Sequence, residues 1–420
     1  MPKPYVTILG KAVKAVAKLR GGGSALPGLV VERIDPNFIK DTLASLPHGV
    51  VIVSGTNGKT TTTKMVVELL ESQGLRVFTN RTGSNFTRGV AAALLGEIDI
   101  HGKLSADIAV LELDEAHAVH FVRTIPPRFS LILNVMRDQL DRFGEIDATA
   151  QLLQTIVTAT TETVVLNRED PRIASLAANA KSVRYFGLAP SLVSTFPSDD
   201  NLHGKAKHIS DLPAEVTLMQ FDGTSATFRI DNQDITTKLK LNGIYNVYNS
   251  AAALALVRVI LSDVVPATKL VTALSQVTPA FGRGETIVID GQPVELVLVK
   301  NPSGFRLGLQ SFSPTNHATM IAINDNYADG RDMSWLWDVT FDSLKPSGVS
   351  MVAGIRAYDM ALRLQYDEVP ILHVVPHTGK ALKQFLSSNV NTPKRIYCTY
   401  TAMLGIRREL AKLASVESIG

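Results

Sequence analysis

The chain has 420 residues, of which 45% are apolar and 19% are charged, a balance typical of a globular protein with a sizeable core. Its net charge of +3 is too small to indicate a nucleic-acid partner, and no uncharged apolar run reaches the length of about 18 residues that spans a bilayer. Its single cysteine, Cys398, excludes an internal disulfide and a cysteine-rich zinc site. We therefore expect a soluble protein, cytoplasmic by default, with about two or three domains.

The first 20 residues predict a basic amphipathic helix rather than a signal peptide, because lysines interrupt every apolar run. One helical face carries Val6, Leu9, Val13, Val16 and Ala17. Two roles stay open. The helix packs on the domain and exposes a solvated basic face, or it is drawn to an anionic membrane surface, which would bring the protein to the inner face of the membrane.

A phosphate-binding loop is predicted directly after an apolar strand at residues 50–54. Two glycines let backbone N–H groups approach phosphate oxygens, Lys59 supplies charge for the terminal phosphates, and Thr60 offers a hydroxyl to Mg²⁺. The segment is shorter than the general pattern, whose first glycine would fall at Val53. It predicts an ATP site, with these residues binding the nucleotide: Gly55, Thr56, Asn57, Gly58, Lys59, Thr60 and Thr61.

Alternating strands and helices predict a parallel, doubly wound α/β sheet. Its strands are expected at 50–54, 77–80, 108–113, 131–135 and 163–167. A small antiparallel insertion is expected at 190–241, and a second α/β unit has strands near 295–299, 319–323, 350–352 and 371–374. The predicted domains are an N-terminal segment at 1–48, a central ATP-binding domain at 49–282 and a C-terminal α/β domain at 283–420.

Glu112 ends one of the apolar strands, at the position where a P-loop ATPase needs an oxygen ligand for magnesium. We predict that Glu112 and Thr60 hold Mg²⁺. The alternative is a solvated charge at a strand end.

Three later segments, at 133–144, 166–171 and 241–252, resemble the Mur ligase superfamily when they are taken together with the loop; they contain Asn134, Asn167 and Asn242. These ATP-dependent enzymes activate a carboxylate as an acyl phosphate for attack by an amine. The resemblance implies a Mur-ligase-type central domain and places Asn246 and Asn249 near the adenine. We also expect Arg283 at the nucleotide and the acceptor in a cleft toward Arg283 and Asn301.

Residues 137–147, 300–304 and 324–338 resemble the MurT family more closely. These proteins are synthetase subunits of lipid II isoglutaminyl synthase in peptidoglycan synthesis. The resemblance implies an ATP-dependent carbon–nitrogen ligase that activates the α-carboxylate of D-glutamate in the stem peptide. It also implies a heterodimeric partner, the glutamine amidotransferase GatD, which releases ammonia.

Two departures from the family patterns narrow this interpretation. Ordinary Mur ligases have a histidine where this chain has Gln139 and a carbamylated lysine shortly beyond, yet no lysine lies between Lys103 and Lys181. A second metal and amino-acid ligation are therefore doubtful. The 190–241 segment has no cysteine, and His203 and His208 are too few for a structural site, so we predict no zinc.

An acidic segment follows the strand expected at 319–323. It contains Asp325, Asp329, Asp332 and Asp338, with Arg331, Trp335 and Trp337 among them. A solvated acidic turn is one interpretation. By resemblance, one aspartate here orients the histidine of the partner's Cys-His pair; we choose Asp329, with Asp325 and Asp332 as alternatives. The two tryptophans suit an interface anchor or a core equally.

The predicted catalytic residues are thus Lys59, Glu112 and Asp329. Two other functions stay open: a stand-alone Mur-type or folylpolyglutamate-type ligase, and a nucleotide-binding scaffold without chemistry.

Overall fold

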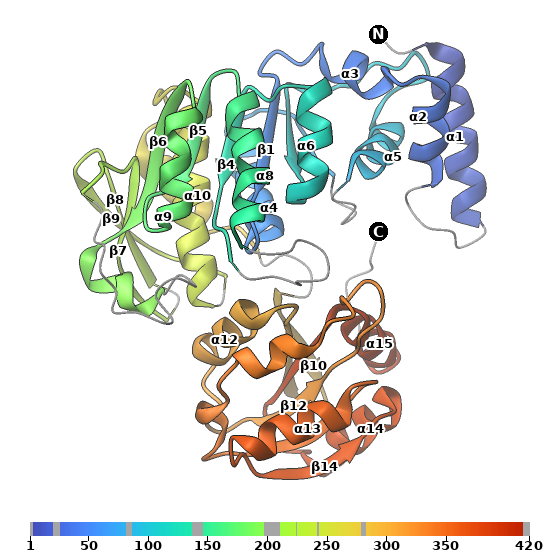
Figure 1. Cartoon of the computed structure of the whole chain (residues 1–420), viewed down its shortest axis with the longest axis vertical. Coiled ribbons are helices and arrows are strands. Elements are labelled where there is room, and N and C mark those ends of the chain that lie inside the picture. The colour runs from blue at the N-terminus through green and yellow to red at the C-terminus, as the bar shows by residue number, and fades with distance from the viewer. Residues whose placement is uncertain are drawn as a thin grey trace. The chain divides into compact units, whose positions relative to one another are not determined.

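The computed structural model describes residues 3–19, 26–80, 86–136, 146–196, 211–223, 225–241, 243–278 and 283–414. They form two compact units (Figure 1). The first comprises residues up to Val135, Asp147–Lys240 and Asn246–Val277, and the second comprises Thr278–Gly420 with short stretches at 136–146 and 241–245. Gln139, His203 and His208 lie outside the described residues, so the predictions that rest on them stay predictions.

The described strands of the first unit form one nine-stranded sheet in the order β2-β3-β1-β4-β5-β6-β7-β8-β9. They are β1 (Val50–Ser54), β2 (Val77–Phe78), β3 (Ile108–Glu112), β4 (Phe129–Ile132), β5 (Thr163–Asn167), β6 (Ser182–Leu188), β7 (Val216–Asp222), β8 (Ser225–Ile230) and β9 (Gln233–Lys238). From β2 to β7 the pairing is parallel, which confirms the predicted α/β class. The predicted antiparallel strands are β7 to β9, and they extend this sheet at its edge.

Helices pack against this sheet and, toward the N-terminus, against one another (Figure 1). They are α1 (Pro4–Leu19), α2 (Leu26–Ile34), α3 (Phe38–Leu43), α4 (Lys59–Glu71), α5 (Thr87–Glu97), α6 (Glu115–Thr124), α8 (Ile146–Ala159), α9 (Pro171–Ser175), η1 (Leu176–Asn179), η2 (Pro190–Thr195), α10 (Ile244–Ile260) and α11 (Ala267–Leu274). All residues of β1 and β3 are buried, as expected for parallel strands covered on both faces. The loops at their carboxyl ends are therefore held by a rigid centre.

The predicted N-terminal helix is confirmed as α1, but its orientation corrects the sequence interpretation. Leu9 and Val16, which were assigned to the apolar face, are exposed. The Nζ atoms of Lys11 and Lys14 donate to carbonyl oxygens in the last turns of α5, at 3.1 and 3.0 Å. Cations are stabilised beside the carbonyls at a helix C-terminus, so these two lysines turn toward the protein and the basic face is not simply solvated.

The described strands of the second unit form a six-stranded sheet in the order β10-β11-β15-β12-β13-β14. They are β10 (Arg283–Ile289), β11 (Gln292–Leu298), β12 (Ala318–Ala322), β13 (Val349–Ala353), β14 (Ile371–Val375) and β15 (Lys394–Cys398). The helices are α12 (Pro302–Ser311), η4 (Ser334–Asp338), η5 (Asp342–Leu344), α13 (Ala357–Tyr366), α14 (Thr378–Ser388) and α15 (Tyr400–Leu410). The predicted strands are confirmed as β11 to β14, whereas β10 and β15 were not predicted.

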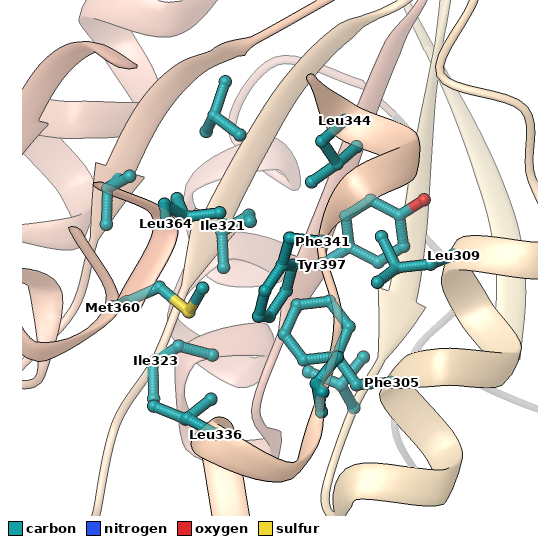
Figure 2. Packing of buried hydrophobic residues seen from close by; sticks show 14 of the residues in the cluster. Phe305, Leu309, Ile321, Ile323, Leu336, Phe341, Leu344, Met360, Leu364 and Tyr397 are labelled. Atoms are coloured by element: carbon teal, nitrogen blue, oxygen red, sulfur yellow. The ribbon is translucent and has the colours of Figure 1, made fainter. Parts of the chain in front are cut away.

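Successive side chains of β12 pack into two different apolar clusters, one on each face of the sheet, because side chains alternate across a sheet. Ile321 packs in one apolar cluster and Met320 in another. At the centre of the first cluster, Phe305 lies 5.0 Å from the Phe341 ring and 5.5 Å from the Tyr397 ring, measured between centroids (Figure 2). The loop after β12 therefore rises from a strand that is buried on both faces. Within the described residues, no helix has the length and apolarity to cross a bilayer.

Candidate nucleotide site and acidic loop

The loop after β1 has a backbone that only glycine fits. Gly55 and Gly58 have φ angles of +127° and +89°, in the region that favours glycine. A Cβ on Gly55 would lie 2.9 Å from the Asn134 carbonyl oxygen, and one on Gly58 would lie 2.8 Å from the Asn249 amide. The loop is thus packed between the chain after β4 and helix α10.

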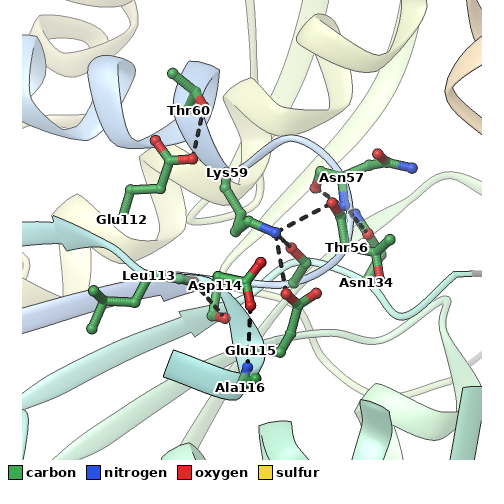
Figure 3. Close-up of polar contacts among 12 residues, drawn as sticks. Thr56, Asn57, Lys59, Thr60, Glu112, Leu113, Asp114, Glu115, Ala116 and Asn134 are labelled. Atoms are coloured by element: carbon green, nitrogen blue, oxygen red, sulfur yellow. Dashed lines mark hydrogen bonds and ion pairs between the residues drawn. The ribbon is translucent and has the colours of Figure 1, made fainter. Parts of the chain in front are cut away.

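Asn134 fixes the centre of this loop through paired hydrogen bonds (Figure 3). The Asn57 backbone N–H donates to Asn134 Oδ1 at 2.9 Å, and Asn134 Nδ2 donates to the Asn57 carbonyl at 3.0 Å. The Thr56 N–H donates to the Asn134 carbonyl at 3.0 Å. This clamp preorganises the loop, and it makes Asn134 a site residue whose role the local sequence pattern does not indicate.

Lys59 begins α4 and is buried together with Glu115. Its Nζ donates to the carbonyls of Gly55 and Thr56 at 2.5 and 3.3 Å, and it lies 3.3 Å from Glu115 Oε2 (Figure 3). A buried ammonium is tolerated only when it is paired and hydrogen-bonded. Glu115 is therefore the counter-charge of the predicted phosphate-binding lysine, a role that its sequence position did not indicate.

Thr60 and Glu112, the two residues predicted to hold Mg²⁺, are in contact: Thr60 Oγ1 donates to Glu112 Oε1 at 2.7 Å. Glu112 is buried and is not a solvated charge. Asn80 positions it, since Asn80 Oδ1 accepts from the Glu112 N–H at 3.0 Å and Asn80 Nδ2 donates to its carbonyl at 2.8 Å. Two hard oxygen atoms at a phosphate-binding loop fit Mg²⁺, which uses few protein ligands and completes its shell with phosphates and water.

With two protein oxygens, the predicted magnesium site would also need phosphate and water oxygens. Among the described residues, no group of three or more His, Cys, Asp or Glu side chains could hold a metal ion.

The Thr61 hydroxyl is a further group that would suit a phosphate ligand. It is buried in the first turn of α4 without a hydrogen-bond partner among the described residues, and a phosphate oxygen would satisfy it.

The start of α10 brings Asn249 against the loop, whereas the roles predicted for Asn246, Asn301 and Arg283 stay predictions. Asn246 lies one turn earlier and its carbonyl accepts from the Ser250 hydroxyl at 2.8 Å. Asn301 is fully buried and caps α12 by accepting from the Gly304 N–H at 2.7 Å. Arg283 begins β10, but its side chain lies outside the described residues.

Asp329, on the acidic loop after β12, is only 2% exposed. Its Oδ1 accepts from the Thr401 N–H at 2.7 Å, and its Oδ2 accepts from the Thr401 hydroxyl at 2.5 Å and from the Asn326 N–H at 3.1 Å. The carboxylate thus ties the loop to the first turn of α15. Its predicted role toward a partner's histidine stays a prediction.

The other two candidate aspartates are partly exposed. Asp325 Oδ2 lies 3.5 Å from Arg356, and Asp332 accepts from the Ser334 N–H at 2.9 Å. The tryptophans divide between the two interpretations that were left open. Trp335 is buried beside Phe305, whereas Trp337 is exposed.

The sheet topology and the glycine-bounded loop define a class, the α/β proteins with Mur ligase architecture. Two family descriptions match: Mur ligase middle domain over residues 53–257 and MurT ligase C-terminal over residues 298–403. Among solved structures, a pseudomurein peptide ligase type C from Methanothermus fervidus has a TM-score of 0.68 at 19% identity, over 90% of this chain and 80% of that chain. MurF ligase from Thermotoga maritima, solved in complex with ADP, has a TM-score of 0.66 at 17% identity, over 90% and 84%.

A curated relative narrows the class. The lipid II isoglutaminyl synthase (glutamine-hydrolyzing) subunit MurT of Streptococcus pneumoniae is 31% identical over 96% of this chain and 96% of its own length. The chain belongs to the MurT family.

Proposed function

We propose that this chain is the ATP-dependent synthetase subunit of a lipid II isoglutaminyl synthase, which amidates the D-glutamate α-carboxylate of a peptidoglycan precursor to D-isoglutamine. The observation that carries the proposal is the 31% identity with a subunit of that name over 96% of both chains. The buried Lys59, with Thr60 and Glu112 meeting beside it, supports ATP use.

The chemistry explains why such an enzyme needs ATP. A carboxylate is a poor electrophile without a leaving group. Transfer of the γ-phosphoryl group to a carboxylate oxygen releases ADP and gives an acyl phosphate; ammonia then attacks the carbonyl carbon, and inorganic phosphate leaves with the bonding electrons. The loop N–H groups, Lys59 and the Thr61 hydroxyl would bind and orient the triphosphate.

Magnesium would be held by Thr60 and Glu112, and when bound it would neutralise charge on the transferred phosphoryl group. The chain's own contribution is to fix these oxygens. Asn80 holds the Glu112 backbone, while α4 fixes Thr60 one residue after Lys59. Asn246, Asn249 and Arg283 are proposed as further nucleotide-binding residues.

Ammonia would come from a GatD-type glutaminase, and one face of the second unit suits a protein partner. Trp337, Tyr358, Leu362 and Tyr366 are all exposed there, and the Trp337 and Tyr366 rings lie 5.4 Å apart. Tyr358, Leu362 and Tyr366 recur at every fourth position of α13, so they share one helical face. Large aromatic side chains of this kind anchor protein interfaces.

An aspartate of the 325–332 loop is proposed to orient the partner's catalytic histidine. Asp329 is the first candidate. Because an imidazole could reach it only by displacing contacts with Thr401, the partly exposed Asp325 and Asp332 are tested beside it.

The test is reconstitution with the partner subunit, a lipid-linked precursor in detergent, ATP-Mg²⁺ and glutamine, followed by mass analysis of the precursor. We expect a mass change for one amide that requires both proteins. Amide formation with glutamine but no second protein, or transfer of a whole amino acid, would indicate a stand-alone ligase. Nucleotide binding without acceptor-dependent ADP release would indicate a scaffold.

A further inference from the structure

Helix α1 presents a solvent-exposed face that is entirely apolar. The fractional exposures are 60% for Tyr5, 59% for Ile8, 45% for Leu9 and 50% for Val16. Ala12 and Ala15 are exposed between them. The spacing of these positions by three and four residues puts them on one continuous stripe of the helix.

This exposure is not the result of a loosely attached helix. Val6, Thr7, Gly10 and Ala17, on the opposite face, are buried. A Cβ on Gly10 would lie 2.6 Å from side-chain atoms of both Leu95 and Val31, so α1 fits closely against α2 and α5. Figure 1 shows α1 and α2 side by side at one end of the first unit.

The charged residues in the sequence that carries the apolar stripe are all of one sign. Lys3, Lys11, Lys14, Lys18 and Arg20 precede the first acidic residue of the chain, Glu32. Lys11 and Lys14 are residues of α1, and their Nζ atoms donate to carbonyl oxygens of α5, so both charges lie on the side of α1 that faces α5. A helix that combines an outward apolar face with lysines and no carboxylate complements an anionic lipid surface.

We propose that the Tyr5–Val16 face of α1 inserts into the headgroup and acyl boundary of an anionic phospholipid bilayer. The choice of a membrane rests on the charge complementarity and, through the proposed function, on a substrate whose lipid carrier lies in a bilayer. With 16 residues, α1 is too short to span about 30 Å of hydrocarbon, so it lies along the surface.

Insertion predicts a different salt dependence from simple attraction of a basic face. The apolar contribution survives screening, while the contribution of the lysines weakens as the Debye length falls from about 30 Å at 0.01 M to about 8 Å at 0.15 M salt. Binding should therefore decrease with salt but persist at 0.15 M, which is about physiological ionic strength.

The first experiment measures sedimentation of the full chain with phosphatidylglycerol–phosphatidylcholine vesicles that contain no peptidoglycan precursor. The variant Ile8→Ser/Leu9→Ser removes apolar surface and keeps every charge. The matched control is Ile100→Ser/Val264→Ser, because these side chains are also exposed on the first unit, at 61% and 81%. We expect at least about tenfold weaker binding for the α1 variant and unchanged binding for the control.

The second experiment reports on depth. Cys398 is the only cysteine and is fully buried, and burial raises the pKa of its thiol, so Leu9→Cys can be labelled selectively with an environment-sensitive fluorophore. The label at position 9 should shift to the blue on addition of vesicles. A label introduced by Ile100→Cys should not.

Absence of wild-type binding, equal binding by the α1 variant and its control, or no spectral shift at position 9 would overturn the proposal. So would a wild-type dimer that Ile8→Ser/Leu9→Ser converts to a monomer, because a second copy would then cover the face. Since the vesicles contain no substrate, such failure is distinct from failure of the proposed amidation, which is measured in detergent.

Discussion

Two strand-end loops in different units of this chain use polar groups in opposite ways. The loop after β1 holds its own shape with backbone and Asn134 contacts, and it leaves the Thr61 hydroxyl without a partner among the described residues. The loop after β12 uses the Asp329 carboxylate to hold Thr401. The loops that follow these two parallel-paired strands are therefore preorganised by different means. In the loop after β1 a side chain from a neighbouring loop does this, and in the loop after β12 it is the loop's own carboxylate.

This difference shows why a carboxylate at a strand end is weaker evidence for catalysis than a glycine-bounded loop. Gly55 and Gly58 have positive φ angles, which residues other than glycine rarely adopt. A glycine-bounded loop in the sequence is therefore a specific signal of a phosphate-binding backbone. A buried aspartate that accepts three hydrogen bonds has a sufficient structural reason to be present. Variants in the two loops should accordingly fail in different ways.

Lys59→Ala should have the largest effect. We expect at least about a 10³-fold loss of ATP-dependent amidation, because a charge on the transferred phosphoryl group loses its partner. The variant should also lose about 3 kcal/mol of stability, since Glu115 remains buried without its counter-charge. Lys59→Ala/Glu115→Gln is the control: it should regain the melting temperature without activity. Recovery of both would remove Lys59 from the chemistry.

Asp329→Asn tests the second loop. Glutamine hydrolysis by the complex should fall about 10²- to 10³-fold if the loop orients the partner's histidine, and free ammonia should restore amidation. Loss of the carboxylate that Thr401 contacts should also cost about 1–3 kcal/mol.

Asp325→Asn and Asp332→Asn are the comparison for this prediction. A variant that keeps its melting temperature and loses only glutamine hydrolysis identifies the third residue. Normal hydrolysis in all three variants would show that the loop does not serve the glutaminase, and failure of ammonia to rescue Asp329→Asn would assign it to the synthetase site.

Trp337→Ala/Tyr366→Ala should weaken association with the partner subunit about 100-fold while leaving ATP binding unchanged, because both rings are exposed on the same face of the second unit. Titration calorimetry with the purified partner measures the change. Val288→Ser/Val390→Ser removes exposed apolar side chains elsewhere in that unit and should have little effect. Equal effects of the two pairs would contradict a specific docking face.

Glu112→Gln should raise the magnesium concentration for half-maximal activity about tenfold, because an amide is a weaker ligand for a hard cation. Glu162→Gln is the matched control, since Glu162 forms an exposed ion pair with Arg128. An unchanged magnesium requirement in Glu112→Gln would exclude this residue as a ligand.

The sequence predicted the regular apolar elements well and the long-range contacts poorly. The strands at 50–54 and 163–167 have the predicted bounds. Strand β15 was missed because it begins with Lys394 and Arg395, which are buried; Arg395 pairs with Glu295 at 2.6 Å and lies over the Phe312 ring. The Asn57–Asn134 clamp joins residues 77 positions apart, and no local pattern indicates such a contact.

The smallest expected effect is also the most specific, because it concerns one hydroxyl. Thr61→Val replaces a buried hydroxyl that has no partner among the described residues with a methyl group of similar size, so stability should be unchanged or slightly higher. If that hydroxyl binds a phosphate oxygen, the KM for ATP should rise about three- to tenfold.

Thr63→Val is a stringent control, since Thr63 lies on the same helix and its hydroxyl is also buried without a partner among the described residues. Position 63 is about 200° around the helix from position 61, so the two side chains lie on opposite sides of the helix. A higher KM in the Thr61 variant alone would show that a hydroxyl without an internal partner is kept for the ligand, whereas identical KM values in the two variants would leave both threonines with a purely structural role.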